Sequence, residues 1–287
     1  MKQILFIIFI GLALNASANT YTVTNTNDSG SGSLRAALTS ANSAAGSHSI
    51  VFNIPTTDPG YNSSTGVWTI SLATAFSFIT HSDITIDGTS QTTAQGNTNP
   101  LGPEIMLVRS VSTVDYAFTI YNVSHITIKG FIMSGFYYGV QIYGTNAKYN
   151  TISGNYIGTN CTASDSLGNF IGVEIIGGPK YNTIGGTTVA DRNIVSANEH
   201  IGIRVVNADS NYVIGNYVGT DRTGMQAIGN YDGVSIEGSA SYNFIEKNVI
   251  SGNVAYGIPF IGNTVTHNRV MGNMLGVNVN GTAALPN

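Results

Sequence analysis

The chain has 287 residues, of which 42% are hydrophobic and only 9% are charged. Soluble proteins usually carry about 25% charged residues, so this composition excludes a disordered polyelectrolyte and a coiled coil. The net charge of −4 excludes the strongly basic surface that dominates nucleic-acid binding, and we expect no nucleic-acid partner.

The first residues match a secretory signal peptide. Met1 to Gln3 carries a positive charge, Ile4 to Leu14 is apolar, and Ala16 to Ala18 supplies small residues for cleavage. The apolar run is about 11 residues long, shorter than the roughly 20 that a spanning helix needs. We predict a signal peptide over residues 1–18, a secreted or cell-surface protein, with the periplasm as a further destination, and no transmembrane segment.

The best helical stretch runs from Ser33 to Asn42. Ser33 suits an N-cap, and one face of the helix collects the apolar side chains Leu34, Ala37, Leu38 and Ala41. Because an open sheet edge templates aggregation, we expect this helix to cover the first strands of the fold. Residues 19–60 are therefore predicted to form an N-terminal cap.

The segment between this cap and residue 139 has a looser strand pattern. Strand-like pieces run from Ile50 to Ile54 and from Trp68 to Leu72. One phrase then occurs twice, at Ile84 to Gly88 and at Ile126 to Gly130. We expect three or four irregular coils here, and about eight to ten coils in the whole chain at the usual strand spacing.

From residue 139 the chain repeats itself five times. Each copy opens with Gly, an apolar β-former, any residue and another apolar residue, and the copies start at Gly139, Gly172, Gly202, Gly233 and Gly257. A period of 20 to 50 residues indicates a solenoid, a propeller or an array, and each unit here has strand character without a helical pattern. Residues 139–287 are predicted to form regular coils.

Asparagines recur every five residues inside these copies, with a β-branched residue two places after many of them. Asn tolerates the left-handed backbone of a tight corner, and amides stacked on one another can donate to one neighbour and accept from the other. We interpret them as a structural ladder, with one member of the first column in each coil: Asn150, Asn182, Asn211, Asn243 and Asn263.

Short strands separated by corners predict a chain that coils and stacks on itself in parallel. Three strands make one coil, and alternate Val and Ile side chains point inward to form stacked aliphatic layers. We predict an all-β fold, a right-handed parallel β-helix with a short N-terminal capping helix, forming a single domain over 19–287. Because residues 281–287 copy residues 224–230, we expect the chain to be truncated at its C-terminus.

Several phrases resemble one known family, the secreted bacterial right-handed parallel β-helix repeat proteins. The likeness is carried by the segments Asn150 to Thr159, Asn211 to Asp221, Ile84 to Gln91 and Gly32 to Asn42, and it covers nearly all of the mature chain. The family shares its architecture with pectate lyases, polygalacturonases, alginate epimerases and adhesins. The resemblance therefore implies the fold more strongly than an activity.

Catalytic residues are sought on the outward column of the five opening strands. Its middle positions read Gln141, Glu174, Arg204, Ser235 and Pro259. Glu174 and Arg204 lie one coil apart and are the candidate catalytic pair, although an exposed ion pair of little energy is the simpler interpretation. No second carboxylate is evident beside them, whereas sugar hydrolysis needs two.

No cofactor or metal site is predicted. Asp165, Asp191 and Asp221 come from loops of consecutive coils and are oxygen ligands of the kind that Ca²⁺ takes, but no calcium-binding motif is present and turn-forming Asp is the simpler interpretation. The five histidines have no metal-ligand spacing. Cys161 is the one cysteine, so it cannot form a disulfide within the chain, and we interpret it as a loop residue.

Tyrosines are the candidate ligand-binding residues. Tyr149, Tyr181 and Tyr242 each precede the first ladder Asn of their coil, with Ser210 in the remaining place, and Tyr156 and Tyr217 hold equivalent outward positions on another face. Rings along a rod can stack on sugar rings, although tyrosines that stabilise the β-surface by stacking on one another are the simpler interpretation.

The sequence thus predicts an exported bacterial scaffold for binding or adhesion, directed to polysaccharide or another cell-surface molecule and without catalytic activity. The alternative is a polysaccharide lyase or glycoside hydrolase of the pectin-degrading type. The number of Asp and Glu residues on one face distinguishes an enzyme from a binding scaffold, and the sequence places few of them on any one face. Nothing in it indicates an oligomeric state.

Overall fold

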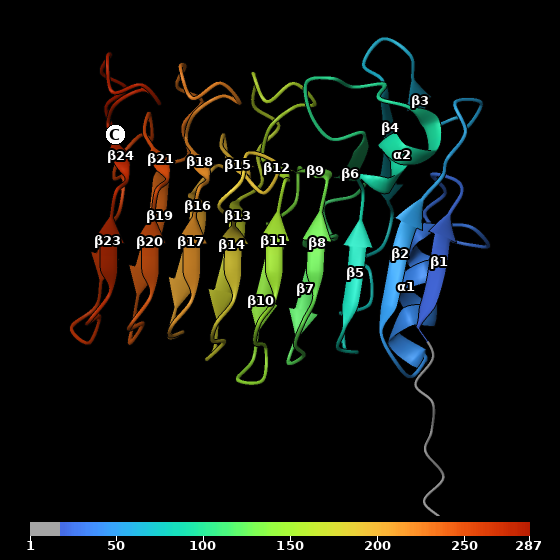
Figure 1. Ribbon diagram of the computed structural model, residues 1–287, viewed down its shortest axis with the longest axis horizontal. Coiled ribbons are helices and arrows are strands. Elements are labelled where there is room, and N and C mark those ends of the chain that lie inside the picture. Colours follow the sequence, from blue (N-terminus) through green and yellow to red (C-terminus); the bar gives the residue numbers. More distant parts are fainter. Residues whose placement is uncertain (1–17) are drawn as a thin grey trace, which may run out of the picture.

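The computed structural model describes residues 18–287, which wind into a parallel β-helix made of three long sheets (Figure 1). From β5 to β22 each coil passes through sheet A, then sheet B, then sheet C. All pairings between strands of different coils are parallel, and the antiparallel pair of β3 with β4 is a local hairpin. The predicted signal peptide lies outside the described residues, except for Ala18.

Sheet A has nine strands, which fall within the eight to ten coils expected. In spatial order they are β1 (Asn19–Val23), β2 (His48–Phe52), β5 (Ile84–Asp87), β8 (Thr127–Lys129), β11 (Thr151–Ser153), β14 (Thr183–Gly185), β17 (Tyr212–Ile214), β20 (Phe244–Glu246) and β23 (Arg269–Met271).

Sheet B also has nine strands. They are β3 (Tyr61–Asn62), β4 (Val67–Leu72), β6 (Ile105–Arg109), β9 (Phe131–Ser134), β12 (Tyr156–Ile157), β15 (Ile194–Val195), β18 (Tyr217–Val218), β21 (Val249–Ile250) and β24 (Met274–Leu275).

Sheet C has six strands, most of them longer than those of the other sheets. They are β7 (Tyr116–Tyr121), β10 (Tyr138–Tyr143), β13 (Ile171–Ile176), β16 (Ile201–Val206), β19 (Asp232–Glu237) and β22 (Phe260–Ile261).

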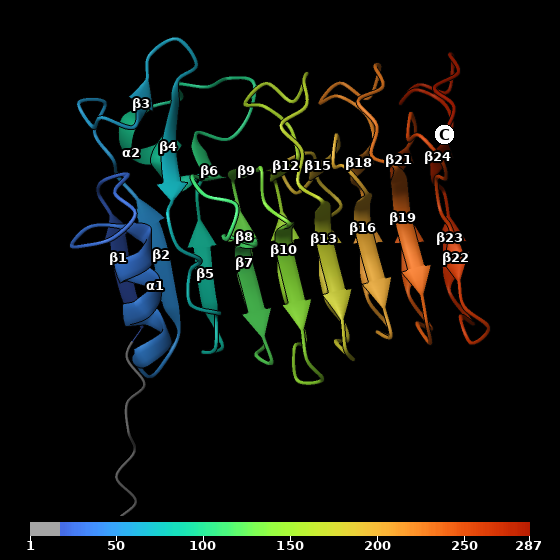
Figure 2. The ribbon, with the colours of Figure 1, turned by 180° about the vertical axis from the view of Figure 1, so that it is seen from behind.

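The helix is right-handed, as predicted. In Figure 1 the strands of sheet A rise on the near side while successive coils advance to the left. Figure 2 shows sheet C from the opposite side, with its strands descending while the coils advance to the right. Both views describe the same right-handed turn, the hand that crossovers between parallel strands nearly always take.

The interior consists of aliphatic side chains stacked from coil to coil. On sheet C, Val140 lies in register with Val173, and the same column continues through Ile203 and Val234. All four side chains are buried. At the strand spacing of about 4.8 Å each side chain contacts the one above and the one below, so removing one methylene group leaves a defect in a continuous column.

The N-terminal helix α1 (Leu34–Ser43) forms where predicted. The Ser33 side chain accepts a hydrogen bond from the Ala36 N–H, which is the expected N-cap interaction. The helix packs against β1 and β2 at the first coil, and its buried residues are the four predicted ones, Leu34, Ala37, Leu38 and Ala41.

A second helix, α2 (Ser90–Gln95), was not predicted because its sequence is polar and has no apolar face. Its buried Gln91 accepts from the Ile54 N–H at 2.9 Å and donates to the Ile54 carbonyl at 2.8 Å. The Gln91 side chain thus satisfies both the N–H and the carbonyl of Ile54, where the chain leaves β2. Neither helix in residues 18–287 has the length and apolar character needed to cross a membrane.

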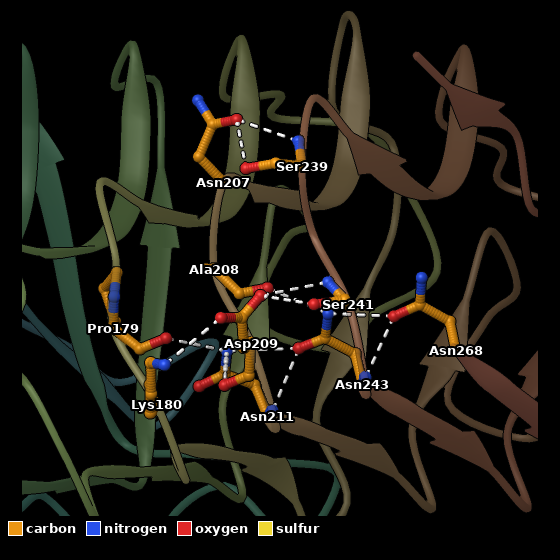
Figure 3. A network of polar contacts seen from close by, with 10 residues as sticks. All are labelled: Pro179, Lys180, Asn207, Ala208, Asp209, Asn211, Ser239, Ser241, Asn243 and Asn268. Atoms are coloured by element: carbon orange, nitrogen blue, oxygen red, sulfur yellow. Dashed lines mark hydrogen bonds and ion pairs between the residues drawn. The ribbon is translucent and has the colours of Figure 1, made fainter. Parts of the chain in front are cut away.

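The asparagine ladder forms, and every rung is satisfied. The Asn211 Nδ2 donates to the Asn243 Oδ1 at 3.2 Å, and the Asn211 backbone N–H donates to the same oxygen at 2.9 Å (Figure 3). Asn182 repeats both bonds one coil earlier, and Asn150 repeats them two coils earlier. Because the same Nδ2 groups also reach backbone carbonyls, these buried amides need no water.

One predicted rung was wrong. The residue that follows Asn243 in the ladder is Asn268, whose Oδ1 accepts from the Asn243 Nδ2 at 3.0 Å, and not Asn263 (Figure 3). Asn263 lies exposed in the turn after β22. The five-residue rhythm of the asparagines made both registers fit, and only the pairing of β20 with β23 distinguishes them.

Two further ladders line the other corners. The second contains Asn155, Asn193, Asn216, Asn248 and Asn273, and the third contains Asn169, Asn198, Asn230, Asn253 and Asn287. Asn160 and Asp221 continue the sequence rhythm but instead bond to backbone N–H groups of their own loops.

Candidate functional site

The outward column on sheet C contains the two candidate catalytic residues. Gln141, Glu174, Arg204 and Ser235 are consecutive register partners on β10, β13, β16 and β19. The predicted juxtaposition of Glu174 and Arg204 is therefore correct. Their environment differs from the exposed ion pair expected, because the Glu174 side chain is only 1% exposed.

Both Glu174 carboxylate oxygens are bound. The Gln141 Nε2 donates to Oε2 at 2.7 Å, and the Arg204 Nη1 donates to Oε1 at 3.0 Å. A buried carboxylate requires such partners, since desolvation without them costs several kcal/mol. Glu174 is thus held as part of a hydrogen-bonded network.

A second carboxylate lies beside the pair, which corrects the expectation that none does. Arg204 also forms a two-pronged ion pair with Glu237, through Nε to Oε1 at 3.0 Å and Nη2 to Oε2 at 2.7 Å. Ser235 donates to the Glu237 Oε1 at 2.8 Å. The sequence signal was the i,i+2 spacing of Ser235 and Glu237, which places both side chains on the outer face of β19.

The network keeps Glu237 ionised. Burial by itself raises the pKa of Glu237, but the hydrogen bonds from Arg204 and Ser235 and the charge of Arg204 outweigh it, and the pKa lies below its usual value. A carboxyl group with a lowered pKa is a poor proton donor near neutral pH. The Arg204 guanidinium binds both carboxylates, so neither is positioned as a free acid or base.

Two tyrosines border this network. Tyr116 and Tyr138 stack with ring centroids 5.1 Å apart and planes 7° apart. Burial, followed by the charge of Glu174, raises the pKa of Tyr138 to about 12. Burial and the Asp115 charge raise the pKa of Tyr116 in the same direction. The phenols therefore stay neutral, and their rings serve as packing groups.

Three of the candidate tyrosines, Tyr149, Tyr181 and Tyr242, belong to a column of side chains at the corner that leads into sheet A. We call this the corner column and define it by the residues with positive φ that lie two positions before each strand of sheet A from β8 to β23: His125, Tyr149, Tyr181, Ser210, Tyr242 and His267. Their φ values fall between 55° and 60°. Tyr149 and Tyr242 are each 53% exposed.

Rings stack along the corner column wherever neighbouring coils both carry one. Centroids lie 5.5 Å apart for His125 and Tyr149, 5.4 Å for Tyr149 and Tyr181, and 4.8 Å for Tyr242 and His267, with planes within 12° of parallel. Ser210 interrupts the column, since it carries no ring between Tyr181 and Tyr242. Within residues 18–287, one face of each of these two rings therefore has no ring beside it.

Tyr156 and Tyr217 occupy equivalent positions on sheet B but are not comparably accessible. Tyr217 is only 6% exposed and lies beneath the Arg192 guanidinium, 4.0 Å from the ring centroid. Tyr156 is half-buried and donates its hydroxyl hydrogen to the Leu101 carbonyl at 2.5 Å. Surrounding loops cover both rings, which the strand pattern alone did not reveal.

A groove on the outer face of sheet A adjoins the corner column. It has a volume of about 450 Å³ and is lined by Thr151, Thr183, Gly185, Gly186, Thr187, Asp191, Tyr212 and Ile214. Tyr212 stacks on Phe244 with centroids 4.8 Å apart. Sequence reasoning did not single out these two rings, although the shared position after the first ladder Asn marks both.

A second aromatic column was also missed. Tyr137, Phe170, His200 and Tyr231 precede consecutive strands of sheet C, and their centroids lie 4.5, 5.1 and 5.9 Å apart from one to the next. His200 thus lies between the rings of Phe170 and Tyr231. This column has a ring at every step, unlike the corner column.

The three loop acids have separate roles. Asp221 accepts from the Met225 and Gln226 N–H groups, Asp191 from the Thr188 N–H and hydroxyl, and Asp165 from the Ser166 N–H. Each stabilises its own turn, so they do not form a stacked acidic set. Within residues 18–287 no group of three or more His, Cys, Asp or Glu side chains is placed to hold a metal ion.

No protein-family model matches the chain, and no curated protein matches it. The likeness to β-helix repeat proteins therefore depends on the repeat phrases and on the parallel β-helix itself. Function has to be argued from the surface of this molecule.

Proposed function

We propose that this protein is an exported, non-catalytic β-helix scaffold that binds polysaccharide outside the cell. The predicted signal peptide and the likeness to secreted bacterial β-helix repeat proteins support export. The binding face is formed by the corner column and the adjoining groove on sheet A. Its main partner is a glycan chain, either free or displayed on a cell surface.

The observation that carries this proposal is the position of exposed rings beside an open groove. Tyr149, Tyr181 and Tyr242 lie along one corner of a rigid rod, and Thr183 and Tyr212 line the groove next to them. Sugar rings present C–H groups on their faces and hydroxyls on their edges, so they suit aromatic faces bordered by polar groups. The chain is elongated, as an extended glycan requires.

The alternative, a lyase or hydrolase of the pectin-degrading type, is favoured by one observation, the two carboxylates on sheet C. Glu174 and Glu237 would be the pair that hydrolysis requires. Both are bound to Arg204, however, and Glu237 has a lowered pKa. We therefore assign this network to stability, with the binding face elsewhere.

Binding is tested on a panel of soluble glycans: cello-, xylo- and manno-oligosaccharides, polygalacturonate and alginate. We expect the purified protein to bind at least one of them, and Tyr181→Ala and Tyr242→Ala to weaken that binding at least tenfold. Tyr256→Ala is the matched control, because Tyr256 is 64% exposed and lies in neither aromatic column. Absence of binding across the panel, or equal loss with Tyr256→Ala, would overturn the proposal.

Catalysis is tested on the same glycans by following unsaturated products and new reducing ends. We expect no turnover. Turnover that disappears with Glu174→Gln or Arg204→Ala would establish the enzymatic alternative instead.

A further inference from the structure

We propose that the position of Ser210 in the corner column is a subsite for one pyranose ring with equatorial substituents, held between Tyr181 and Tyr242. We call the space between the two tyrosine rings at this position the Ser210 gap. The inference rests on the proposed polysaccharide function and specifies which sugar the binding face takes and where. It depends on three features: the backbone register, the two ring faces and the polar groups beside them.

The backbone passes through the gap without a break. The Tyr181 N–H donates to the Ser210 carbonyl at 3.1 Å, and the Ser210 N–H donates to the Ser241 carbonyl at 3.1 Å. Ser210 also keeps the positive φ of the column, 58° against 60° for Tyr181 and 58° for Tyr242. The two tyrosines are therefore held two coils apart, and only a ring is missing between them.

The spacing matches the thickness of one inserted ring. Two coil steps amount to about 9.6 Å at the usual strand separation. A ring placed midway would lie about 5 Å from each tyrosine, within the usual range for stacked rings. Neighbouring rings in the same column are separated by similar distances, 5.4 Å for Tyr149 and Tyr181 and 4.8 Å for Tyr242 and His267.

Polar groups border the gap where a sugar carries its hydroxyls. Within the described residues the Ser210 hydroxyl forms no side-chain hydrogen bond. Beside it, Asp209 accepts from the Ser241 hydroxyl at 2.9 Å and pairs with Lys180 at 3.2 Å (Figure 3). These groups are only partly buried and can exchange bonds with a ligand. A sugar in the gap can form a hydrogen bond with the Ser210 hydroxyl, whereas an aromatic ligand without polar substituents cannot.

The gap also continues into the groove on sheet A. Ser210 is two residues from Tyr212 and Tyr181 is two residues from Thr183, and both Tyr212 and Thr183 line that groove. A chain with one ring in the gap can therefore place neighbouring sugars in the groove. This continuity favours an oligosaccharide over a single sugar or a lone aromatic side chain.

Two facing tyrosines select the configuration of the sugar. A pyranose with all its substituents equatorial presents only C–H groups on both faces, as in β-1,4-linked glucose or xylose. An axial hydroxyl would be pressed against one ring without a hydrogen-bond partner, which is unfavourable. We therefore expect β-1,4-glucose or β-1,4-xylose oligomers to bind and β-1,4-mannose oligomers, with their axial O2, to bind much more weakly.

The test fills the gap with the residue that the column uses elsewhere. Ser210→Tyr adds a ring at a position whose backbone already suits tyrosine, whereas Ser210→Ala keeps the gap open. Calorimetry with cellohexaose, xylohexaose and mannohexaose is expected to show at least tenfold tighter binding of one of the first two than of mannohexaose. Ser210→Tyr should weaken that binding at least tenfold, and by more than Ser210→Ala, which removes only the hydroxyl.

The outcomes separate this inference from the proposed function. If Ser210→Tyr binds like the unaltered protein while Tyr181→Ala and Tyr242→Ala lose binding, the polysaccharide function stands and the subsite is wrong. Mannohexaose binding as tight as cellohexaose binding also overturns the subsite. If the unaltered protein binds no glycan, both proposals fail. If Ser210→Tyr does not fold, the comparison is made with alanine variants of the column. The subsite then requires Tyr181→Ala and Tyr242→Ala to weaken cellohexaose or xylohexaose binding more than Tyr149→Ala does. An equal or larger loss in Tyr149→Ala rejects the subsite.

Discussion

The Arg204 guanidinium lies 3.0 Å from the carboxylate of Glu174, one coil away, and that carboxylate is buried on the outer face of sheet C. An exposed surface was expected at this position. The long side chains of neighbouring coils instead lie over one another and exclude water. The pair is therefore a structural element whose removal has a measurable cost.

Arg204→Ala leaves Glu174 buried without its cation. Since the Arg204 side chain is itself 28% exposed and water can enter after truncation, we expect a loss at the lower end of about 3–5 kcal/mol in the free energy of unfolding. Urea unfolding measures it. Adding Glu174→Gln to Arg204→Ala should restore part of the loss, because a neutral amide needs no cation. Arg222→Ala, at an exposed arginine, should change stability by less than about 0.5 kcal/mol.

Stability at acid pH should depend on Glu237. Its pKa in the folded protein lies below the ordinary value of 4.5, so its contribution is present above about pH 4.5 and is lost as the pH falls through the lowered pKa. Glu237→Gln should remove this component and flatten the fall in urea midpoint between pH 5 and pH 3. An unchanged slope in Glu237→Gln would assign the acid sensitivity to other carboxylates, such as Asp209, whose pKa is also lowered.

Tyr138 should ionise late. Burial and the Glu174 charge raise its pKa to about 12, so its neutral form is favoured in the folded state, and its stabilising contribution is present below about pH 10 and lost as the pH rises through 12. Phenolate absorbance should show a step near pH 12 that is missing in Tyr138→Phe and shifts downward in Glu174→Gln. Tyr256→Phe should retain that step. A step that is insensitive to Tyr138→Phe contradicts the assignment.

The asparagine ladder provides a test with two asparagines. Asn211→Ala removes the oxygen that accepts from the Asn182 backbone and amide, and leaving those buried donors unpaired should cost about 1–3 kcal/mol. Asn263→Ala changes an exposed turn residue and should be nearly neutral. Thermal or urea unfolding compares the stability of the two variants. Equal losses at both positions would contradict the assignment of Asn211 to the ladder and of Asn263 to an exposed turn.

Much of the fold could be predicted from the local pattern. The repeated Gly openings, the inward Val140 and Ile142 and the helix behind Ser33 follow from periodicity and capping, which depend on neighbouring residues. The helix around Gln91 could not be predicted in this way, because its burial depends on contacts with Ile54, 37 residues away in sequence.

The site was less predictable for the same reason. The sequence determined which residue types recur, and so the parallel coils, the asparagine ladder and a column of tyrosines interrupted at Ser210. The tertiary structure alone decided that Asn268 and not Asn263 completes a rung, that Glu237 joins Glu174 on Arg204, and that loops cover Tyr217. Spacing along a chain sets which face a side chain occupies, whereas register between coils and the path of the loops set which atoms meet and which remain open to solvent.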